Sequence, residues 1–373
     1  MPIAPQTVVA DPSAVSALQA GVVAGPAIVD LPTGRAQAAT ALAVFRTSCP
    51  TLLRRADTSG LTRNGDWQPA CNAAQGSADP ERFFADWFEA VQVGDGKAVA
   101  TGYYEPEIAA SRERRSGYDV PIYARPDDLI EVDLSQFSKD LAGKRIRGKV
   151  SGRSFVPYDD RAAIVTAGLN GRAQVLAWAA DPIAFFFLQV QGSGRLRLPD
   201  GGVMRIGYAS QNGRDYTGIG QLMLSRGLLA PGQASMQGIV AWLRANPEQG
   251  RAIMDENRSF VFFRELDGPP LGALGLPVIG GVSVAADPRF VPLGAPVLLS
   301  MDRSDANGVW IAQDTGGAIK GSNRFDTFWG AGEAAAATAG GMKARGTAWV
   351  LVPRGTLARL SAEGRLGGPA AQR

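Results

Sequence analysis

The chain has 373 residues, of which 45% are hydrophobic, with a net charge of +3, two cysteines and no histidine. This length and hydrophobic content suffice for two or three domains with buried cores. The missing histidine excludes Ser-His-Asp triads, Cys-His nucleophiles and most zinc sites. The small net charge gives no indication of a nucleic-acid surface. Without histidine, the side chains that remain for acid–base chemistry are Asp, Glu, Lys and Tyr. We predict that the protein needs neither a metal nor a cofactor, and that it stays active in the presence of a chelator.

The sequence shows no apolar run close to the roughly 20 residues that cross a bilayer. Its richest apolar run, residues 184–188, has the size of a core segment. Residues 1–34 lack the basic start and apolar block of an intact signal peptide, and we predict that they form a flexible segment. A membrane contact is therefore expected only through an N-terminal anchor that is not visible here.

The first predicted elements are two helices and a strand. Apolar spacing predicts a helix over 41–55, and a second helix begins at Asp79-Pro80, where Asp is a capping residue and Pro suits the first turn. After the Gly-Asp-Gly turn at 94–96, residues 98–104 are predicted to form a strand that leads into Glu105.

The two cysteines, Cys49 and Cys71, lie in one short region with turn residues between them. A disulfide between them is slightly favoured and would fit an oxidising compartment. Two buried free thiols are the alternative, because cysteine is among the most buried residue types.

The middle of the chain contains predicted helices that start at Asp160 and Asp181. The second helix leads into the run 189–194, whose small residues and glutamine amides suit contact with a hydroxylated ligand. A hairpin follows, with residues 195–198 and 203–206 alternating about an Asp-Gly-Gly turn. Residues 217–258 are predicted to be helical.

From residue 259 the pattern changes to strands separated by Gly-Pro turns. We predict a compact β-barrel or sandwich, followed by a flexible tail at 356–373. The predicted strands are 260–264, 278–284, 297–300, 309–313 and 348–352.

Two carboxylates lie close together in the sequence near the end of this region. Asp314 closes an apolar strand and precedes Thr315-Gly316-Gly317, and Asp326 follows 12 residues later. If they come close in space, one raises the pKa of the other from about 3.9 and creates a proton donor near neutral pH. The structural alternative is that Asp314 caps the Thr-Gly-Gly turn and Asp326 caps a short helix around Thr327. Lys320 would pair with either Asp or hold an anionic group, unless it is a solvated surface lysine.

Four motifs in a fixed order resemble the MltA family of lytic murein transglycosylases. The resemblance covers residues 80 to 353, and the number and order of the motifs make it specific. The motifs are Thr101-Gly-Tyr-Tyr-Glu-Pro, Phe187-Leu-Gln-Val-Gln-Gly-Ser-Gly, Tyr208-Ala209 with Asn212-Gly213 and Tyr216, and Ala312-Gln-Asp-Thr-Gly-Gly-Ala-Ile-Lys-Gly with Phe325-Asp326.

The resemblance implies a mainly β protein with flanking helices: a double-psi β-barrel domain with an inserted β-rich second domain and a glycan groove between them. The barrel would comprise residues 35–108 and 257–355, and the inserted domain residues 109–256. The implied reaction cleaves the β-1,4 bond between N-acetylmuramic acid and N-acetylglucosamine of peptidoglycan, and leaves 1,6-anhydromuramyl ends. Asp326 matches the catalytic Asp of the family. Asp314 matches the neighbouring Asp of the family motif, which would orient the catalytic Asp or interact with its charge.

The resemblance also implies substrate contacts, partners and a location. Peptidoglycan glycan strands are the expected substrate, and proteins of cell-wall synthesis or division are the candidate protein partners. The periplasm, with association to the outer membrane, is the expected location, although the family's usual N-terminal lipid-bearing cysteine is absent from a chain that begins Met1-Pro2-Ile3. Tyr103 and Tyr104 are candidate sugar platforms, unless they are core tyrosines, and the other candidate contacts are Glu105, Gln189, Gln191, Gly192, Ser193 and Lys320.

Two other functions compete with this interpretation. Asp314-Thr315-Gly316 after an apolar strand is typical of aspartic proteases, but a second Asp-Thr/Ser-Gly motif is missing and a one-Asp dimeric protease would be far shorter. A non-catalytic glycan-binding or scaffold protein would keep the glutamine-rich segment but would not need Asp326. Replacement of Asp326 distinguishes the last class from an enzyme.

Overall fold

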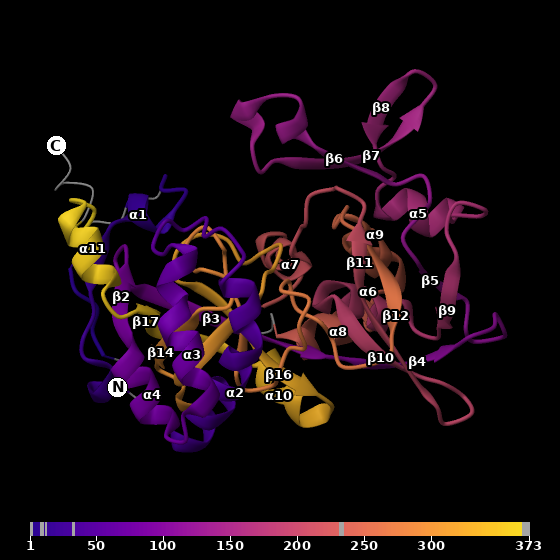
Figure 1. The fold of residues 1–373 in the computed structure, drawn as a ribbon. Helices are drawn as coiled ribbons and strands as arrows, with labels where there is room; N and C mark the ends of the chain where they lie inside the picture. Colours follow the sequence, from indigo (N-terminus) through magenta and orange to yellow (C-terminus); the bar gives the residue numbers. More distant parts are fainter. Residues whose placement is uncertain (1–2, 8–10, 12, 32–33, 231–234, 368–373) are drawn as a thin grey trace. The chain divides into compact units, whose positions relative to one another are not determined.

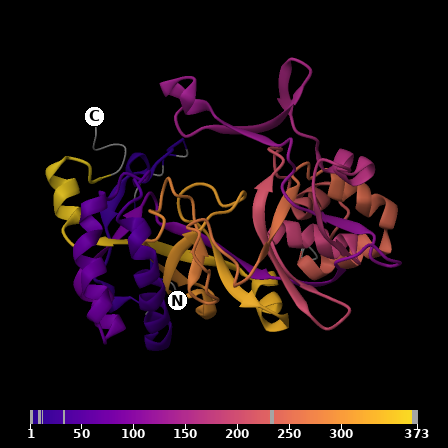
Figure 2. The same ribbon diagram turned by 45° about the vertical axis from the view of Figure 1, so that its right-hand side comes forward.

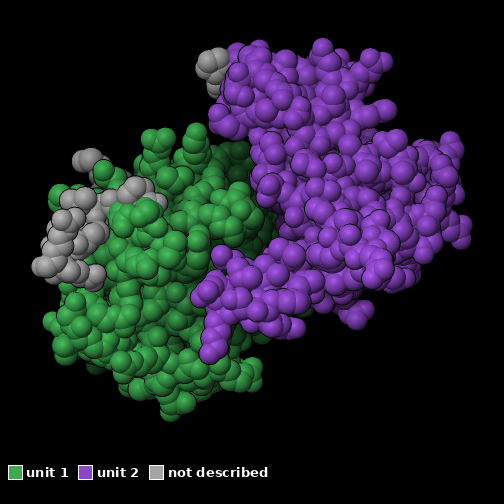
Figure 3. Space-filling view, turned by 90° about the horizontal axis from the view of Figure 1, so that it is seen from above, with its two compact units in different colours: residues 1–104, 271–373 green, residues 105–270 purple. Residues whose placement is uncertain are grey.

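The computed structural model describes residues 3–7, 11, 13–31, 34–230 and 235–367. The chain divides into two compact units (Figure 3). Unit 1 contains Met1–Tyr104 and Leu271–Arg373, and unit 2 contains Glu105–Pro270. Among the described residues, no helix is both long enough and apolar enough to span a bilayer.

Unit 1 is built around a closed ring of six strands. β17 pairs with both β14 and β3, which closes the order β17-β14-β15-β13-β16-β3, and β2 and β1 extend the sheet from β17. Aliphatic and aromatic side chains from these strands fill one continuous core. The predicted β-barrel with flanking helices is therefore confirmed. The strands are β1 (Val22–Ala24), β2 (Phe88–Val93), β3 (Lys97–Glu105), β13 (Ser283–Ala285), β14 (Pro296–Met301), β15 (Gly308–Asp314), β16 (Arg324–Ala331) and β17 (Lys343–Pro353).

Three helices, α2, α3 and α4, lie side by side against the outside of the barrel (Figures 1 and 2). Asp79 caps α4 by accepting a hydrogen bond from the Arg82 N–H, as its position before Pro80 predicts. Phe45, Trp67 and Phe88 fill the second core that these helices share with the barrel. The helices of unit 1 are α1 (Ala17–Ala20), α2 (Arg35–Leu52), α3 (Gln68–Gly76), α4 (Pro80–Trp87), α10 (Glu333–Gly340) and α11 (Thr356–Ala362), with short 3-10 turns η1 (Ile28–Asp30), η2 (Asn64–Trp67) and η5 (Ser304–Ala306).

A disulfide between Cys49 and Cys71 joins α2 to α3. Because it closes a loop with a sequence separation of 22, it restricts the unfolded chain. We expect the Cys49→Ala/Cys71→Ala double variant to lose about 3 kcal/mol of unfolding free energy. Urea unfolding of the oxidised protein and the variant measures this difference. An unchanged midpoint would show that the bridge does not stabilise unit 1.

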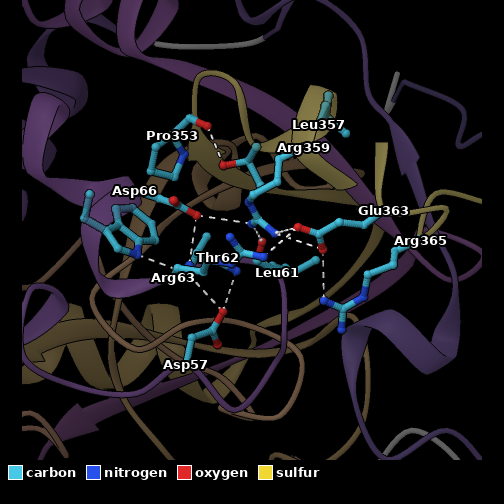
Figure 4. A network of polar contacts seen from close by, with 12 residues as sticks. Asp57, Leu61, Thr62, Arg63, Asp66, Pro353, Leu357, Arg359, Glu363 and Arg365 are labelled. Atoms are coloured by element: carbon cyan, nitrogen blue, oxygen red, sulfur yellow. Dashed lines mark hydrogen bonds and ion pairs between the residues drawn. The ribbon is translucent and has the colours of Figure 1, made fainter. Parts of the chain in front are cut away.

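The segment after the barrel is ordered, which corrects the predicted flexible tail for residues 356–362. These residues form α11, and Arg359 fixes the helix to the preceding part of unit 1 (Figure 4). Its guanidinium donates to the Leu61 carbonyl at 2.7 Å and to Asp66 at 3.2 Å, and it also pairs with Glu363. Residues 368–373 of the predicted tail lie outside the described part of the chain.

The N-terminal segment also differs from its prediction. Val22–Ala24 forms β1, which pairs antiparallel with β2, so the expected flexible segment is wrong for these residues. Ala17 and Val22 are buried in the barrel core. The short apolar runs here lack a clear period, and long-range pairing with β2 decides their structure.

Unit 2 contains a six-stranded sheet of order β12-β11-β10-β4-β9-β5 and a separate three-stranded sheet, β6-β7-β8. The predicted hairpin is present: β10 and β11 pair antiparallel, with Leu196 and Met204 buried. Its strands are β4 (Glu107–Ser111), β5 (Val120–Tyr123), β6 (Ile130–Asp133), β7 (Arg145–Ser151), β8 (Ser154–Pro157), β9 (Val175–Ala179), β10 (Ser193–Arg197), β11 (Val203–Gln211) and β12 (Val261–Leu266).

Two helices of unit 2 begin where the sequence predicts them. Asp160 and Asp181 each cap a helix through a side-chain oxygen that accepts backbone N–H groups. β12, by contrast, pairs with β11 of unit 2 rather than with the barrel, which corrects its grouping with the barrel strands. The helices are α5 (Arg161–Ala167), α6 (Pro182–Gln191), α7 (Ile219–Ser225), α8 (Met236–Ala245) and α9 (Pro247–Asp255), with η3 (Leu134–Gln136) and η4 (Lys139–Leu141).

Candidate active site

Asp314 and Asp326 are held by two strands of the barrel with β13 between them. Ala285 of β13 pairs with Asp314 on β15 and with Asp326 on β16. Residues that pair directly across strands point to the same face of a sheet, and neighbouring strands lie about 4.8 Å apart. The two carboxylates therefore share one face of the barrel. Because Asp326 lies inside strand β16, the alternative in which it caps a helix is wrong.

Asp326 has the properties of a proton donor near neutral pH. Its side chain is half-buried, and its Oδ1 accepts a hydrogen bond from the Thr101 hydroxyl at 2.6 Å. Burial is the main cause that raises the pKa of Asp326, and the charge of Asp314 adds to the rise, so that the pKa reaches about 6. The Thr101 hydrogen bond and the charge of Arg324 act in the opposite direction. A substantial fraction of this carboxyl group is therefore protonated at mildly acidic pH.

Asp314 is held in place by three donors. The Tyr103 hydroxyl donates to its Oδ2 at 2.9 Å, and the backbone N–H groups of Ala273 and Thr315 donate to its Oδ1 at 3.0 and 2.8 Å. Burial raises the pKa of Asp314, while these hydrogen bonds oppose the rise. Because the Thr315 N–H donates to Asp314, Asp314 does cap the Thr-Gly-Gly turn, as the structural alternative predicted. It also lies on the same face of the barrel as Asp326.

Tyr103 connects Asp314 to the barrel wall. Its ring packs against Phe328 with a centroid distance of 4.9 Å. Burial and the charge of Asp314 hold its pKa well above the usual range, so its hydroxyl keeps the proton that it donates. In this position Tyr103 orients a carboxylate, a role that the sugar-platform prediction did not include.

Thr101 contacts Asp326, although it was not among the predicted site residues. It lies two residues before Tyr103 in β3, so both side chains leave the strand on the same face. One strand thus supplies a hydroxyl to each carboxylate: Thr101 to Asp326 and Tyr103 to Asp314. The two-residue period of the predicted strand 98–104 contained this signal.

The loop that joins the two carboxylates is fixed at its base and carries Lys320 at the surface. Buried Asp287 accepts the Gly321 N–H at 2.9 Å and pairs with Arg289 at 2.6 Å. Asn323 adopts a φ of 56° and donates to the Val93 carbonyl at 2.8 Å. Lys320 is exposed and, within the described residues, has no ion pair, so the predicted pairing with either Asp is not seen.

The predicted contacts Glu105 and Gln189 are buried inside unit 2. Both amide atoms of Gln189 are used there: its Oε1 accepts from Arg161 at 2.6 Å, and its Nε2 donates to the Val261 carbonyl at 3.0 Å. Glu105 pairs with Arg195 at 3.0 Å. Because both amide atoms of Gln189 are used in these interior bonds, a direct ligand contact by Gln189 is not supported. The sequence could not distinguish the two roles, because an amide side chain can bind a ligand or hold the interior of a domain together.

The remaining predicted contacts are partly accessible. Gln191 and Ser193 are half-buried where α6 ends and β10 begins, and Gly192 between them has a left-handed φ of 80° that closes α6. Tyr104 is also half-buried, and burial raises its pKa. Over the described ranges, no group of three or more Cys, Asp or Glu side chains is arranged to hold a metal ion.

Comparisons with known proteins agree with this architecture. The family description "MltA specific insert domain" matches residues 99–264, and "3D domain" matches residues 282–352. Membrane-bound lytic murein transglycosylase A of Vibrio cholerae is 30% identical over 291 residues, which cover 74% of this chain and 72% of that protein.

Solved structures show the same similarity. MltA from Neisseria gonorrhoeae superposes with a TM-score of 0.75 and 37% identity, covering 95% of this chain and 97% of that one. Escherichia coli MltA with bound chitohexaose has a TM-score of 0.65 and 26% identity, covering 89% and 93%. Two matching family descriptions, a relative of this identity and coverage, and the barrel with its pair of carboxylates together place this chain in the MltA family of lytic murein transglycosylases.

Proposed function

We propose that this protein cleaves the β-1,4 bond between N-acetylmuramic acid and N-acetylglucosamine of peptidoglycan, with Asp326 acting first as acid and then as base. The observation that carries the assignment is a half-buried carboxyl group with a pKa of about 6, beside a second carboxylate in a barrel of this family. A lytic transglycosylase releases 1,6-anhydromuramyl ends and consumes no water.

The reaction needs one group that gives a proton and later takes one. Protonated Asp326 donates to the glycosidic oxygen as the bond from that oxygen to C1 of the muramyl residue breaks. The resulting carboxylate then removes the proton from the C6 hydroxyl of the same sugar, whose oxygen bonds to C1 and closes the anhydro ring. Ordinary glycosidases need a second carboxylate as nucleophile or to activate water. The intramolecular hydroxyl replaces that role.

Asp314 supports this cycle through charge and position. Its negative charge raises the pKa of Asp326 and so favours the protonated acid before cleavage. Because Tyr103 and two backbone N–H groups satisfy its oxygens, Asp314 remains a fixed neighbour. It acts through Asp326 and needs no contact with substrate in this scheme.

We propose candidate substrate contacts in each unit by itself. Chitohexaose, an oligomer of N-acetylglucosamine, is bound in the E. coli relative, which supports a glycan strand as ligand. Our candidate contacts are the partly accessible Tyr104, Gln191, Gly192 and Ser193 and the exposed Lys320. The division into a barrel domain and an inserted substrate-binding domain belongs to the same proposal.

The relatives' names place them at a membrane, and peptidoglycan lies outside the bacterial inner membrane. We infer a periplasmic, membrane-associated location for this protein. The Cys49–Cys71 disulfide agrees with an oxidising compartment. Association with the outer membrane and with proteins of cell-wall synthesis or division is the finer part of this proposal.

Mass spectrometry of the fragments released from isolated sacculi tests the reaction type. Fragments one water lighter than hydrolytic muropeptides, without a reducing end, are expected. Reducing sugars would indicate an ordinary glycosidase, and cleaved peptides would indicate a protease. Sacculi that bind the protein but remain intact would indicate a binding module.

The pH dependence of the reaction follows from Asp326. Since the first step needs the protonated carboxyl group and its pKa is about 6, kcat/KM should fall as pH rises through that value. Above it, the decline should be about tenfold per pH unit. Initial rates of fragment release between pH 4 and 9 measure this profile. A rate that stays constant to about pH 8 would contradict Asp326 as the acid.

A further inference from the structure

The three-stranded sheet β6-β7-β8 has one face that is apolar along its length. In β7, Ile146, Gly148 and Val150 alternate with three basic residues. Pairing aligns the apolar residues of β6 and β8 with these positions. The two-residue strand period therefore gives one face, here called the apolar face, formed by Ile130, Val132, Ile146, Val150, Phe155 and Pro157.

The apolar face has no partner in the described structure. A β-carbon on Gly148 would lie 2.7 Å from Cζ of Phe155, so the Phe155 ring covers the centre of the sheet. No residue of this sheet belongs to any of the hydrophobic cores of unit 2. The sheet stands out from the body of that unit (Figure 1). Large side chains of the apolar face remain open to solvent: Ile130 39%, Ile146 44%, Val150 62% and Phe155 40%.

The opposite face of the sheet is satisfied by ion pairs. Arg145 and Arg147 both pair with Glu131, the former at 3.0 Å, and Lys149 pairs with Asp159 at 2.6 Å. These charges stabilise the sheet from one side and are already used. The sheet therefore keeps its shape while its apolar face remains uncovered.

Free positive charges lie at both ends of the sheet. Lys139 and Lys144 belong to the connection between β6 and β7, and Arg153 to the turn between β7 and β8. All three are exposed and, among the residues that the structure describes, none forms an ion pair. Asp140 is the one acidic residue in these two connections. A partner of the apolar face thus meets a positive margin at each end.

We propose that the apolar face and its terminal cations form an interfacial binding surface for a bilayer that contains anionic phospholipids. Aliphatic and phenylalanine side chains would enter the boundary between headgroups and acyl chains, while Lys139, Lys144 and Arg153 meet lipid phosphates. The surface binds the membrane from outside and requires no spanning segment. This role does not depend on the proposed reaction.

Other partners fit this surface less well. A glycan strand needs hydrogen-bonding groups and aromatic platforms, whereas the six residues of the apolar face offer aliphatic surface and one phenylalanine. A second copy of the chain, docked face to face about a two-fold axis, would bring like charges together at the ends. A bilayer surface matches the apolar centre and the positive ends at the same time.

Co-sedimentation of the full chain with lipid vesicles tests this proposal. Binding is expected to phosphatidylcholine vesicles that contain phosphatidylglycerol, weakening at high salt, with much less binding to phosphatidylcholine alone. The Lys139→Glu/Lys144→Glu/Arg153→Glu variant should bind at least about 100-fold more weakly, since each cation near an anionic surface contributes about a fivefold factor. The Val150→Ser/Phe155→Ser variant should lose about tenfold or more. Val203→Ser and Arg264→Glu, which alter exposed residues elsewhere in unit 2, are the matched controls and should bind normally.

Three results would overturn the proposal. The first is absent vesicle binding, or binding that the sheet variants do not change. The second is a dimer in analytical ultracentrifugation that Val150→Ser/Phe155→Ser abolishes, which would assign the face to a second copy. The third is retention on sacculi that is lost in the cation variant while vesicles do not bind, which would assign the cations to an anionic wall polymer.

Discussion

Asp326→Asn should reduce the release of anhydro fragments from sacculi by about 10³-fold or more, because an amide can neither donate the proton nor take it back. The amide keeps an oxygen for the Thr101 hydroxyl, so the local structure should remain. Asp86→Asn, a change at an exposed carboxylate of unit 1, is the matched control and should retain full activity. Residual activity of Asp326→Asn near the unsubstituted rate would assign the acid to another group.

The same variant should be more stable than the unsubstituted protein at alkaline pH. Because the folded-state pKa of Asp326 is raised, the folded state binds this proton more tightly than the unfolded state does. Stability is therefore lost as pH rises from the unfolded pKa through about 6, and Asn avoids the loss. The gain at about pH 8 has an upper limit of about 3 kcal/mol, with little difference at about pH 4. Urea unfolding at both pH values distinguishes this outcome from inactivity caused by misfolding.

Asp314→Ala should lower activity by about 100-fold, since loss of the fixed neighbour disturbs both the charge and the geometry at Asp326. It also leaves the Tyr103 hydroxyl and the N–H groups of Ala273 and Thr315 without their acceptor, so stability should fall as well. The kinetic effect is measured as kcat/KM on sacculi-derived glycan strands, and the stability effect by urea unfolding.

Asp314→Asn separates charge from structure. The amide oxygen still accepts the two N–H groups, while the negative charge that raises the pKa of Asp326 is removed. The declining limb of the pH profile should therefore move to lower pH, with stability largely retained. A limb that stays in place would show that Asp314 acts on geometry alone.

The barrel strands β3, β14, β15 and β17 and several helix starts could be predicted from the sequence because local signals determine them. Asp79, Asp160 and Asp181 each cap a helix, as their positions before Pro or a helical pattern indicate. Strand β16 was not predicted, because its aromatic residues Phe325, Phe328 and Trp329 do not alternate strictly with polar residues, and its structure depends on pairing with β13. The site also combines local and long-range features. The two Asp residues could be identified from the local sequence, whereas the contact of Thr101 with Asp326 depends on how the strands are paired.

Residues of one motif can have different roles, and only the fold separates them. Gln189 and Gln191 both belong to the run that was predicted to line a ligand site. Gln189 points inward and holds Arg161 and β12, while Gln191, two residues later, is partly accessible. Burial in a helix depends on what packs against it, and the sequence of α6 alone did not contain that information.

The most direct test of Asp326 as a single acid and base is digestion of sacculi in heavy-oxygen water, followed by mass spectrometry of the fragments. We predict anhydro products without heavy oxygen from the unsubstituted protein, and no such products above background from Asp326→Asn. Heavy oxygen at the new muramyl ends would show that water attacks C1, which would contradict closure of the ring by the C6 hydroxyl.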